Sequence, residues 1–145
     1  MDKKIFRFIE KQKCATVCCV DEQSNPYCFS CFYGFNSKEG LLYFKSSPTS
    51  RHSEIILKNP VVAGTIMPDR LNLLLVKGVQ FEGIVLEKYQ FIAKQASTFF
   101  HKQNPLAITI PGEIWTIQLT NIKMTDNSMG FGKKIYWRRE ILNAG

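Results

Sequence analysis

The chain has 145 residues, of which 45% are hydrophobic and 21% are charged, a composition typical of a folded globular protein. The net charge of +7 favours anionic partners such as a phosphorylated cofactor, nucleic acid or a membrane surface. No apolar run approaches the roughly 18 residues of a membrane helix, and the start MDKKIFRF has no signal-peptide core. We therefore expect a soluble, cytoplasmic protein that forms a single domain over residues 1–145 and does not enter a membrane.

The first half of the chain alternates apolar runs with turn residues. Residues 2–12 carry apolar side chains near helical spacing and predict a short amphipathic helix. Runs of small, β-branched and aromatic residues predict three strands, over residues 14–21, 27–35 and 41–45. A second helix is expected to begin at Thr49 or Ser50, because either hydroxyl can serve as its N-cap, and to stop at Asn59–Pro60.

The second half contains longer elements. Residues 61–67 and 73–87 predict two strands, and Gly78 and Gly83 mark points where the second can bulge or bend. A helix is predicted over residues 89–103, with an apolar side formed by Phe91, Ile92, Ala96, Phe99 and Phe100. A strand of period 2 is predicted over residues 113–125. These elements indicate a mainly β (α+β) fold, a six-stranded antiparallel barrel with peripheral helices.

The turn before the second helix concentrates groups that bind phosphate. Ser46, Ser47, Thr49 and Ser50 offer hydroxyls beside a helix N-terminus with free N–H groups. Arg51 follows in the first helical turn, where a cation opposes the macrodipole unless an anion lies between the two. The sequence leaves two alternatives open here, a phosphate site or a solvated arginine beside an ordinary capped helix.

Five cysteines fall in the first predicted strand pair: Cys14, Cys18, Cys19, Cys28 and Cys31. Their odd number and the expected cytoplasmic setting argue against a disulfide framework. Cys28 and Cys31 form a C-x-x-C pattern, but residues three apart in a strand point to opposite faces and would not share a zinc ion or a disulfide. We therefore predict that the cysteines are small apolar side chains of the core, and we predict no metal site.

The segment after the last predicted strand combines glycines, cations and aromatic residues. The loop 130–134 (GFGKK) can turn sharply at its glycines and would present Phe131, Lys133 and Lys134 to a planar anionic ligand. We expect this loop to fold over the cofactor end of the barrel while Trp137 packs on the barrel wall. The alternative is that Phe131 and Trp137 only cap the core and the lysines face water.

The chain resembles a known family in four stretches: FYGF (Phe32–Phe35), TSRH (Thr49–His52), KGVQFEG (Lys77–Gly83) and TDNSMGFGKKIYWRR (Thr125–Arg139). They are similar to the small bacterial YhbP-type proteins, an uncharacterised branch of the pyridoxamine-5′-phosphate-oxidase-like, FMN-binding split barrels. The resemblance covers nearly the whole chain, and the TDN-x-x-GFGKK pattern is specific to that branch. It implies a six-stranded antiparallel split barrel that forms a homodimer, with FMN at the subunit interface.

The resemblance also implies how the cofactor is held. Lys45 and Ser46 would line the flavin edge, and Ser50, Arg51 and His52 would hold the phosphate. The oxidases usually carry a lysine where this chain has His52. A histidine with the ordinary pKa of about 6.5 is a weaker and pH-dependent phosphate ligand, so we expect weak FMN binding that decreases as the pH rises from about 5.5 to 8.

The remaining implied contacts come from other parts of the chain. Phe32 and Tyr33 would contact the flavin ring from one strand, and Gln80 would reach it from another. Lys133 and Lys134 would add positive charge near the anionic ligand. No residue stands out as a catalytic acid or base, so we assign no catalytic residue.

Three functions follow from these observations. The first is an FMN-dependent oxidoreductase with an unknown small-molecule substrate. It would lack pyridoxamine-phosphate oxidase activity, because the C-terminal substrate-binding pattern of the true oxidases is missing. The second is a haem-binding split barrel, for which His101 is the candidate axial ligand. The third, which we do not favour, is a nucleic-acid-binding module that uses the basic C-terminal segment.

Overall fold

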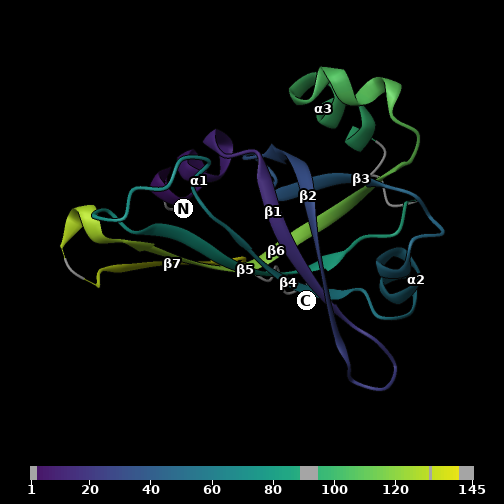
Figure 1. The fold of residues 1–145 in the computed structure, drawn as a ribbon, viewed down its shortest axis with the longest axis horizontal. Coiled ribbons are helices and arrows are strands. Elements are labelled where there is room, and N and C mark those ends of the chain that lie inside the picture. The colour runs from purple at the N-terminus through teal and green to yellow at the C-terminus, as the bar shows by residue number, and fades with distance from the viewer. Residues whose placement is uncertain (1–2, 89–94, 131, 141–145) are drawn as a thin grey trace.

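The computed structural model describes residues 3–88, 95–130 and 132–140. Within these residues, seven strands form one antiparallel sheet in the order β3-β2-β1-β4-β5-β6-β7. They are β1 (Cys14–Val20), β2 (Pro26–Asn36), β3 (Leu41–Ser46), β4 (Val61–Ile66), β5 (Lys77–Val85), β6 (Glu113–Asp126) and β7 (Lys134–Arg138). Because β3 also pairs with β6, six strands close into a barrel and β7 lies outside it (Figure 1). The predicted six-stranded antiparallel barrel is confirmed.

The long strand β6 is the element that closes the barrel. One of its edges pairs with β3 over residues 113–118 and then with β7 over residues 121–125, while the other edge pairs with β5. The register between β5 and β6 shifts at Glu82/Gly83, which confirms the irregularity expected at Gly83. A Cβ at Gly83 would lie 2.6 Å from Ile117 Cγ2 and 2.8 Å from the Gln118 carbonyl oxygen, so the bend brings the two backbones together.

Three α-helices cover the barrel: α1 (Lys3–Lys11), α2 (Arg51–Lys58) and α3 (Ala96–Gln103). The first buries Ile5 and Ile9 completely, as the helical spacing of its apolar residues predicts. The third buries Phe100 against a small second cluster that includes Tyr43. Two 3₁₀ segments follow, η2 (Pro105–Thr109) and η3 (Asn127–Met129). The predicted start of the helix at residues 89–94, with Phe91 and Ile92, lies outside the described residues.

One predicted strand is too long, and one strand was not predicted. The strand expected over residues 73–87 begins only at Lys77, and both Leu73 and Leu74 are 89% exposed. A run of consecutive leucines has no alternation that would fix one face inward, and β4 ends at Ile66 and offers no partner there. Strand β7 was not predicted, although its burial alternates, with Ile135 and Trp137 partly buried between exposed neighbours.

The junction between β6 and β7 is fixed by a buried carboxylate. Asp126 is fully buried, and its Oδ1 accepts hydrogen bonds from the backbone N–H (2.9 Å) and hydroxyl (2.5 Å) of Ser128. Its Oδ2 lies 3.3 Å from Lys4 Nζ on α1. Burial acts to raise the pKa of Asp126, but the bonds from Ser128 and the ion pair with Lys4 outweigh it and hold the pKa below its ordinary value. The carboxylate therefore ties the turn after β6 to the first helix.

Candidate functional site

The turn that joins β3 to α2 brings three of the predicted site residues together. His52 Nε2 lies 2.6 Å from Ser46 Oγ and 3.2 Å from Ser50 Oγ. Ser50 is the N-cap residue of α2, but its hydroxyl makes no capping bond and instead donates to the Ser47 carbonyl at 2.9 Å. The expected hydroxyl cap is therefore wrong. The N–H groups of the first helical turn have no side-chain acceptor from Ser50, so they stay available to an anion.

His52 is held as a partly buried neutral ring. Its imidazole stacks on Phe29, with ring centroids 3.8 Å apart and planes 11° from parallel. Burial lowers the pKa of His52, so the imidazole carries no charge at neutral pH. The sequence predicts His52 as a cationic phosphate ligand, but at neutral pH its uncharged ring is a hydrogen-bonding partner of Ser46 and Ser50. His52 gains its proton only at a pH below its ordinary pKa.

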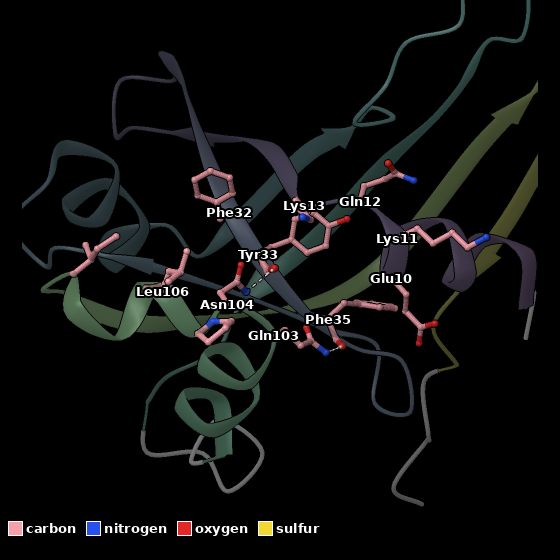
Figure 2. Close-up of a pocket in the computed structure, with 13 residues that line it drawn as sticks. Glu10, Lys11, Gln12, Lys13, Phe32, Tyr33, Phe35, Gln103, Asn104 and Leu106 are labelled. Carbon is pink, nitrogen blue, oxygen red and sulfur yellow. Dashed lines mark hydrogen bonds between the residues drawn. The ribbon is translucent and has the colours of Figure 1, made fainter.

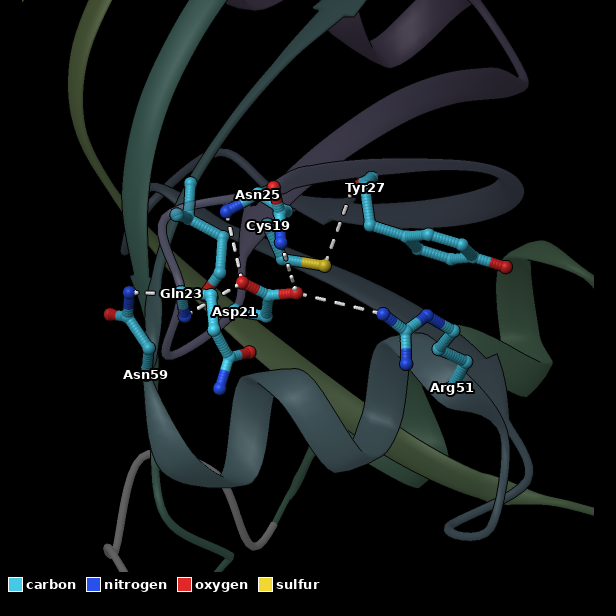
Figure 3. A network of polar contacts seen from close by, with 8 residues as sticks. Cys19, Asp21, Gln23, Asn25, Tyr27, Arg51 and Asn59 are labelled. Atoms are coloured by element: carbon cyan, nitrogen blue, oxygen red, sulfur yellow. Dashed lines mark hydrogen bonds and ion pairs between the residues drawn. The ribbon is translucent and has the colours of Figure 1, made fainter.

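Arg51 is directed toward Asp21 in the β1–β2 turn (Figure 3). Its Nη2 lies 3.6 Å from Asp21 Oδ2, and its guanidinium carbon lies 5.4 Å from the centre of the Tyr27 ring. Asp21 is fixed in turn by the backbone N–H groups of Asn25 and Gln23, each at 2.9 Å. The hydrogen bond from Asn25 makes the largest contribution to lowering the pKa of Asp21. In this structure the predicted phosphate-binding arginine is therefore engaged by the β1–β2 turn.

Lys45 reaches in a different direction, toward α3 and η2. Its Nζ donates to the Ala107 carbonyl at 2.9 Å and lies 3.0 Å from His101 Nε2. His101 Nδ1 lies 2.9 Å from the Ser97 carbonyl. Because an ammonium only donates, Nε2 accepts from Lys45 and Nδ1–H donates to Ser97. Both ring nitrogens of the candidate haem ligand are therefore already engaged.

Phe32 and Tyr33 border a cavity of about 690 Å³ between α1, β2 and η2 (Figure 2). Phe32 is 64% exposed, whereas Tyr33 is buried and donates its hydroxyl to the Ile9 carbonyl at 2.6 Å. Leu106 contributes apolar surface to the same cavity. The cavity shares no lining residue with the cluster of Ser46, Ser50 and His52. Lys45, which precedes Ser46 in the chain, donates to the carbonyl of Ala107 in the cavity lining.

Two polar residues of this cavity wall were missed by the sequence analysis. Gln103 pairs with β2 through its side-chain amide, accepting from the Phe35 N–H at 2.7 Å and donating to the Phe35 carbonyl at 3.0 Å. Asn104 donates to the Tyr33 carbonyl at 3.1 Å. The Asn104–Pro105 pair was interpreted only as a helix stop, and nothing in the sequence indicates that both amides bind β2.

The other predicted site residues lie elsewhere. Gln80 lines a separate cavity of about 760 Å³ on the outside of β5. Lys133 lies in the β6–β7 connection and Lys134 begins β7, and this connection lies at the end of the molecule opposite α2 (Figure 1). The prediction that this loop folds over the α2 end of the barrel is therefore wrong within one chain.

The C-terminal segment instead packs on α1. The Trp137 ring centre lies 5.4 Å from that of Phe6 on α1. Trp137 also packs against the main hydrophobic core, as predicted. The positive φ values of Gly130 (127°) and Gly132 (73°) confirm the sharp turn. Phe131, which was expected to stack on a ligand, lies outside the described residues.

A second tryptophan holds the backbone of the candidate site at Ser46. Trp115, near the start of β6, is buried and donates its indole N–H to the Ser46 carbonyl at 3.2 Å. Its ring lies parallel to that of Phe44, at 11°, with centroids 6.3 Å apart. The backbone at Ser46 is therefore held by the barrel wall while its hydroxyl faces His52.

Within the described parts of the chain, no three His, Cys, Asp or Glu side chains lie close enough together to hold a metal ion. In the same residues, no helix has the length and apolar character needed to cross a membrane.

The closed barrel with its covering helices places the chain among the antiparallel split barrels. Its TM-score is 0.75 with a haem-binding protein from Mycobacterium smegmatis, at 12% identity, over 90% of this chain and 55% of that one. The TM-score is 0.66 with a NimC/NimA family protein from Clostridium acetobutylicum, at 16% identity, over 94% of this chain and 91% of that one. The TM-score is 0.65 with an FAD-binding protein from Mesorhizobium loti, at 15% identity, over 86% of this chain and 94% of that one. At such identities the likeness establishes the fold alone.

The sequence places the chain more narrowly. No family model matches it. It is 37% identical over 135 residues to a UPF0306 protein of Photorhabdus laumondii, which covers 93% of this chain and 94% of that protein. It is 34% identical to a UPF0306 protein of Yersinia pseudotuberculosis, over 93% of this chain and 91% of that protein. The chain therefore belongs to the UPF0306 family. Membership of the wider pyridoxamine-5′-phosphate-oxidase-like group stays a prediction.

Proposed function

We propose that this protein is a flavoprotein that binds FMN with the phosphate at the β3–α2 turn (residues 46–52) and acts as an oxidoreductase on a small molecule. The observation that carries the proposal is the N-terminus of α2, which lacks a side-chain cap and is bordered by the hydroxyls of Ser46 and Ser50. Free helical N–H groups and hydroxyls form the donor set that a phosphate needs. A solved neighbour of this fold is an FAD-binding protein, which supports a flavin.

The residues of the turn fit a phosphate. Ser46 would donate its hydroxyl proton to a phosphate oxygen, and Ser50 would do so once its hydroxyl leaves the Ser47 carbonyl. Neutral His52 lies within hydrogen-bonding distance of both hydroxyls and would orient them. Arg51, whose side chain is 60% exposed, would add a charge-assisted contact once it leaves Asp21, and Asp21 would keep its bonds from the Gln23 and Asn25 N–H groups. The bound flavin would supply the electron transfer, and the chain would supply binding and orientation.

The test of this site is a comparison of FMN affinities by flavin fluorescence titration. Arg51→Ala is expected to weaken binding about ten- to a hundredfold, the value of a charge-assisted phosphate contact. Asp21→Asn removes the competing carboxylate, so it is expected to strengthen binding. Lys58→Ala, at the other end of α2 and paired with exposed Glu22, is the control and should bind as the wild type does. Equal affinity in wild type and Arg51→Ala would remove Arg51 from the site.

The lowered pKa of His52 sets the pH dependence of the same titration. The imidazole is neutral in the folded protein above its ordinary pKa of about 6.5, so FMN affinity is expected to stay constant between about pH 7 and 8. It is expected to rise only as the pH falls further and His52 gains its proton.

A homodimer would bring the scattered ligand contacts into one site. Gln80 and the β6–β7 lysines lie apart from the β3–α2 turn within one chain, so a second copy must supply them if they touch the same flavin. Large apolar side chains are also uncovered, with Leu73 and Leu74 each 89% exposed and Leu106 88% exposed.

Light scattering at micromolar concentration is expected to give twice the 16.7 kDa mass of one chain. Leu74→Asp and Leu106→Asp are expected to shift the mass toward one chain, because a carboxylate at a buried contact opposes association. Glu22→Gln, on the solvated β1–β2 turn, serves as the control. A single species at 16.7 kDa in the wild type would contradict the dimer and the shared site.

Haem binding is the second candidate function. Solved neighbours include the haem-binding protein from Mycobacterium smegmatis and HutZ, a haem storage protein from Vibrio cholerae. His101 would be the axial ligand after giving up its contact with Lys45. The absorbance spectrum of the purified protein separates the two candidates, since a flavin and a haem have different bands, and His101→Ala should abolish only the haem spectrum.

A further inference from the structure

Two cysteines face each other across the β1–β2 hairpin. Cys18 and Cys28 are direct partners in the antiparallel register. Cys28 is exposed and Cys18 is half-buried, and both thiols are free. The expectation that the cysteines are core side chains is therefore wrong for Cys28, and also for Cys14, which is exposed. It holds for Cys19, which is fully buried.

The pair occupies a position where opposite side chains come closest. Hydrogen bonds run from the Tyr33 N–H to the Lys13 carbonyl and from the Asp21 N–H to the Asn25 carbonyl, both at 3.0 Å. Hydrogen-bonded and non-hydrogen-bonded pairs alternate along an antiparallel ladder. Cys18 is three residues from Asp21, so Cys18 and Cys28 form a non-hydrogen-bonded pair, for which the Cα atoms are typically about 4.5 Å apart.

This spacing falls within the range of disulfides, near its short end. Disulfides span Cα separations of about 4.4–6.8 Å, and those at the edge of the range are strained and more easily reduced. As direct cross-strand partners, the two thiols lie on the same face of the hairpin. The hairpin that carries them extends beyond the barrel, so solutes reach it (Figure 1).

The three other cysteines have no such partner. Cys14 lies opposite Phe32, and Cys19 lies opposite Tyr27. Cys31 packs against the core, and burial raises its pKa to about 12. Cys28 and Cys31 point to opposite faces, which confirms that they cannot share a disulfide.

We propose that Cys18 and Cys28 form a reversible thiol–disulfide site that reacts with low-molecular-weight disulfides. The exposed Cys28 thiolate attacks one sulfur of the reagent disulfide, displaces one thiolate and forms a mixed disulfide. The Cys18 thiolate then attacks the Cys28 sulfur, forms the cross-strand bond and displaces the second thiolate. Two electrons pass to the reagent, and the two protein protons end on the two thiols released.

The order of attack follows from the surroundings of the two thiols. Burial, followed by the contact with Cys28, raises the pKa of Cys18, which makes it the poorer nucleophile toward a reagent in solution. Once Cys28 carries the mixed disulfide, Cys18 lies directly opposite the sulfur that it must attack.

The test is to equilibrate the full-length protein with oxidised and reduced glutathione and to record intact masses and disulfide-linked peptides. The wild type is expected to lose two hydrogens and to yield one linked pair, Cys18 with Cys28. Cys18→Ser is expected to keep one glutathione on Cys28, because the second attack is missing, and Cys28→Ser is expected to yield no linked pair. Cys14→Ser should behave as the wild type does.

Three results would overturn the proposal. They are a wild type that stays reduced under fully oxidising ratios, a loss of two hydrogens that persists in Cys18→Ser, and a link that joins two chains. Cys18→Ala and Cys28→Ala repeat the test if a serine variant fails to fold. Because the readout is the mass of the protein, its outcome does not depend on whether a flavin binds.

Discussion

Replacing Gly64 with alanine is expected to lower the free energy of unfolding by about 3 kcal/mol or more, the upper end of what overpacking costs. A Cβ at Gly64 would lie 2.4 Å from the Thr16 carbonyl oxygen and 2.4 Å from Phe81 Cζ. The first neighbour is backbone of β1, which cannot move without opening the β1–β4 pairing. The second is a buried core ring. Urea unfolding followed by circular dichroism measures the loss.

Gly78→Ala is the matched control for this substitution. Gly78 also lies within a strand, but a Cβ there meets the Met67 sulfur at 3.3 Å, the flexible end of a half-exposed side chain. We expect a change within about 1 kcal/mol for this substitution. Similar unfolding midpoints for the two variants would mean that β1 and β4 do not approach as closely as described.

Arg139→Ala is expected to cost about 3 kcal/mol or more. The Arg139 Nε donates to the Leu119 carbonyl at 2.7 Å, and its Nη2 donates to the carbonyls of Glu39 and Gly40 at 2.7 and 2.9 Å. The guanidinium also lies over the Trp137 ring, at 5.6 Å. Hydrogen bonds from charged groups contribute about 1.5–3 kcal/mol each, and their effects overlap when they share one side chain.

The position of Arg139 explains why its loss should propagate. Strand β6 changes its partner from β3 to β7 between Gln118 and Asn121, and the guanidinium bridges that gap to the β2–β3 turn. Arg139→Lys should recover only part of the stability, because one ammonium cannot replace the planar fork. Arg138→Ala is the control, since Arg138 is exposed and bonds only the side chain of Asn121 among the described residues, and it should cost under about 1 kcal/mol. Equal effects at the two positions would contradict the bridging role.

Local patterns made much of the barrel predictable. The helical spacing of Ile5 and Ile9 and the period-2 pattern of β6 identify elements whose faces the core then uses. The strand pair that closes the barrel could not be predicted in this way, because the pairing of Leu41 with Gln118 joins segments far apart in the sequence. The leucines before Lys77 were assigned to a strand because hydrophobicity alone does not distinguish an inward face from an uncovered loop.

The candidate site was predictable in its composition but not in its directions. The sequence indicates serines, an arginine and a histidine near a helix start, and the structure joins Ser46, Ser50 and His52. The sequence does not indicate that Arg51 pairs with Asp21, because this contact joins residues that are far apart in the chain. The cysteine pair was missed because we considered only the spacing of Cys28 and Cys31. Cys18 and Cys28 are placed symmetrically about the hairpin turn, which is the signal that could have revealed them.

The hydrogen bond from the Trp115 indole to the Ser46 carbonyl gives the candidate site an optical probe of its own. Indole emission depends on the polar groups around the ring, so a ligand that moves the β3–α2 turn changes the fluorescence of Trp115. The other tryptophan, Trp137, lies against Phe6 and reports on α1 and β7 instead. In a Trp137→Phe variant, the tryptophan fluorescence of the protein would come from Trp115 alone, so ligand binding at the turn could be followed without any label.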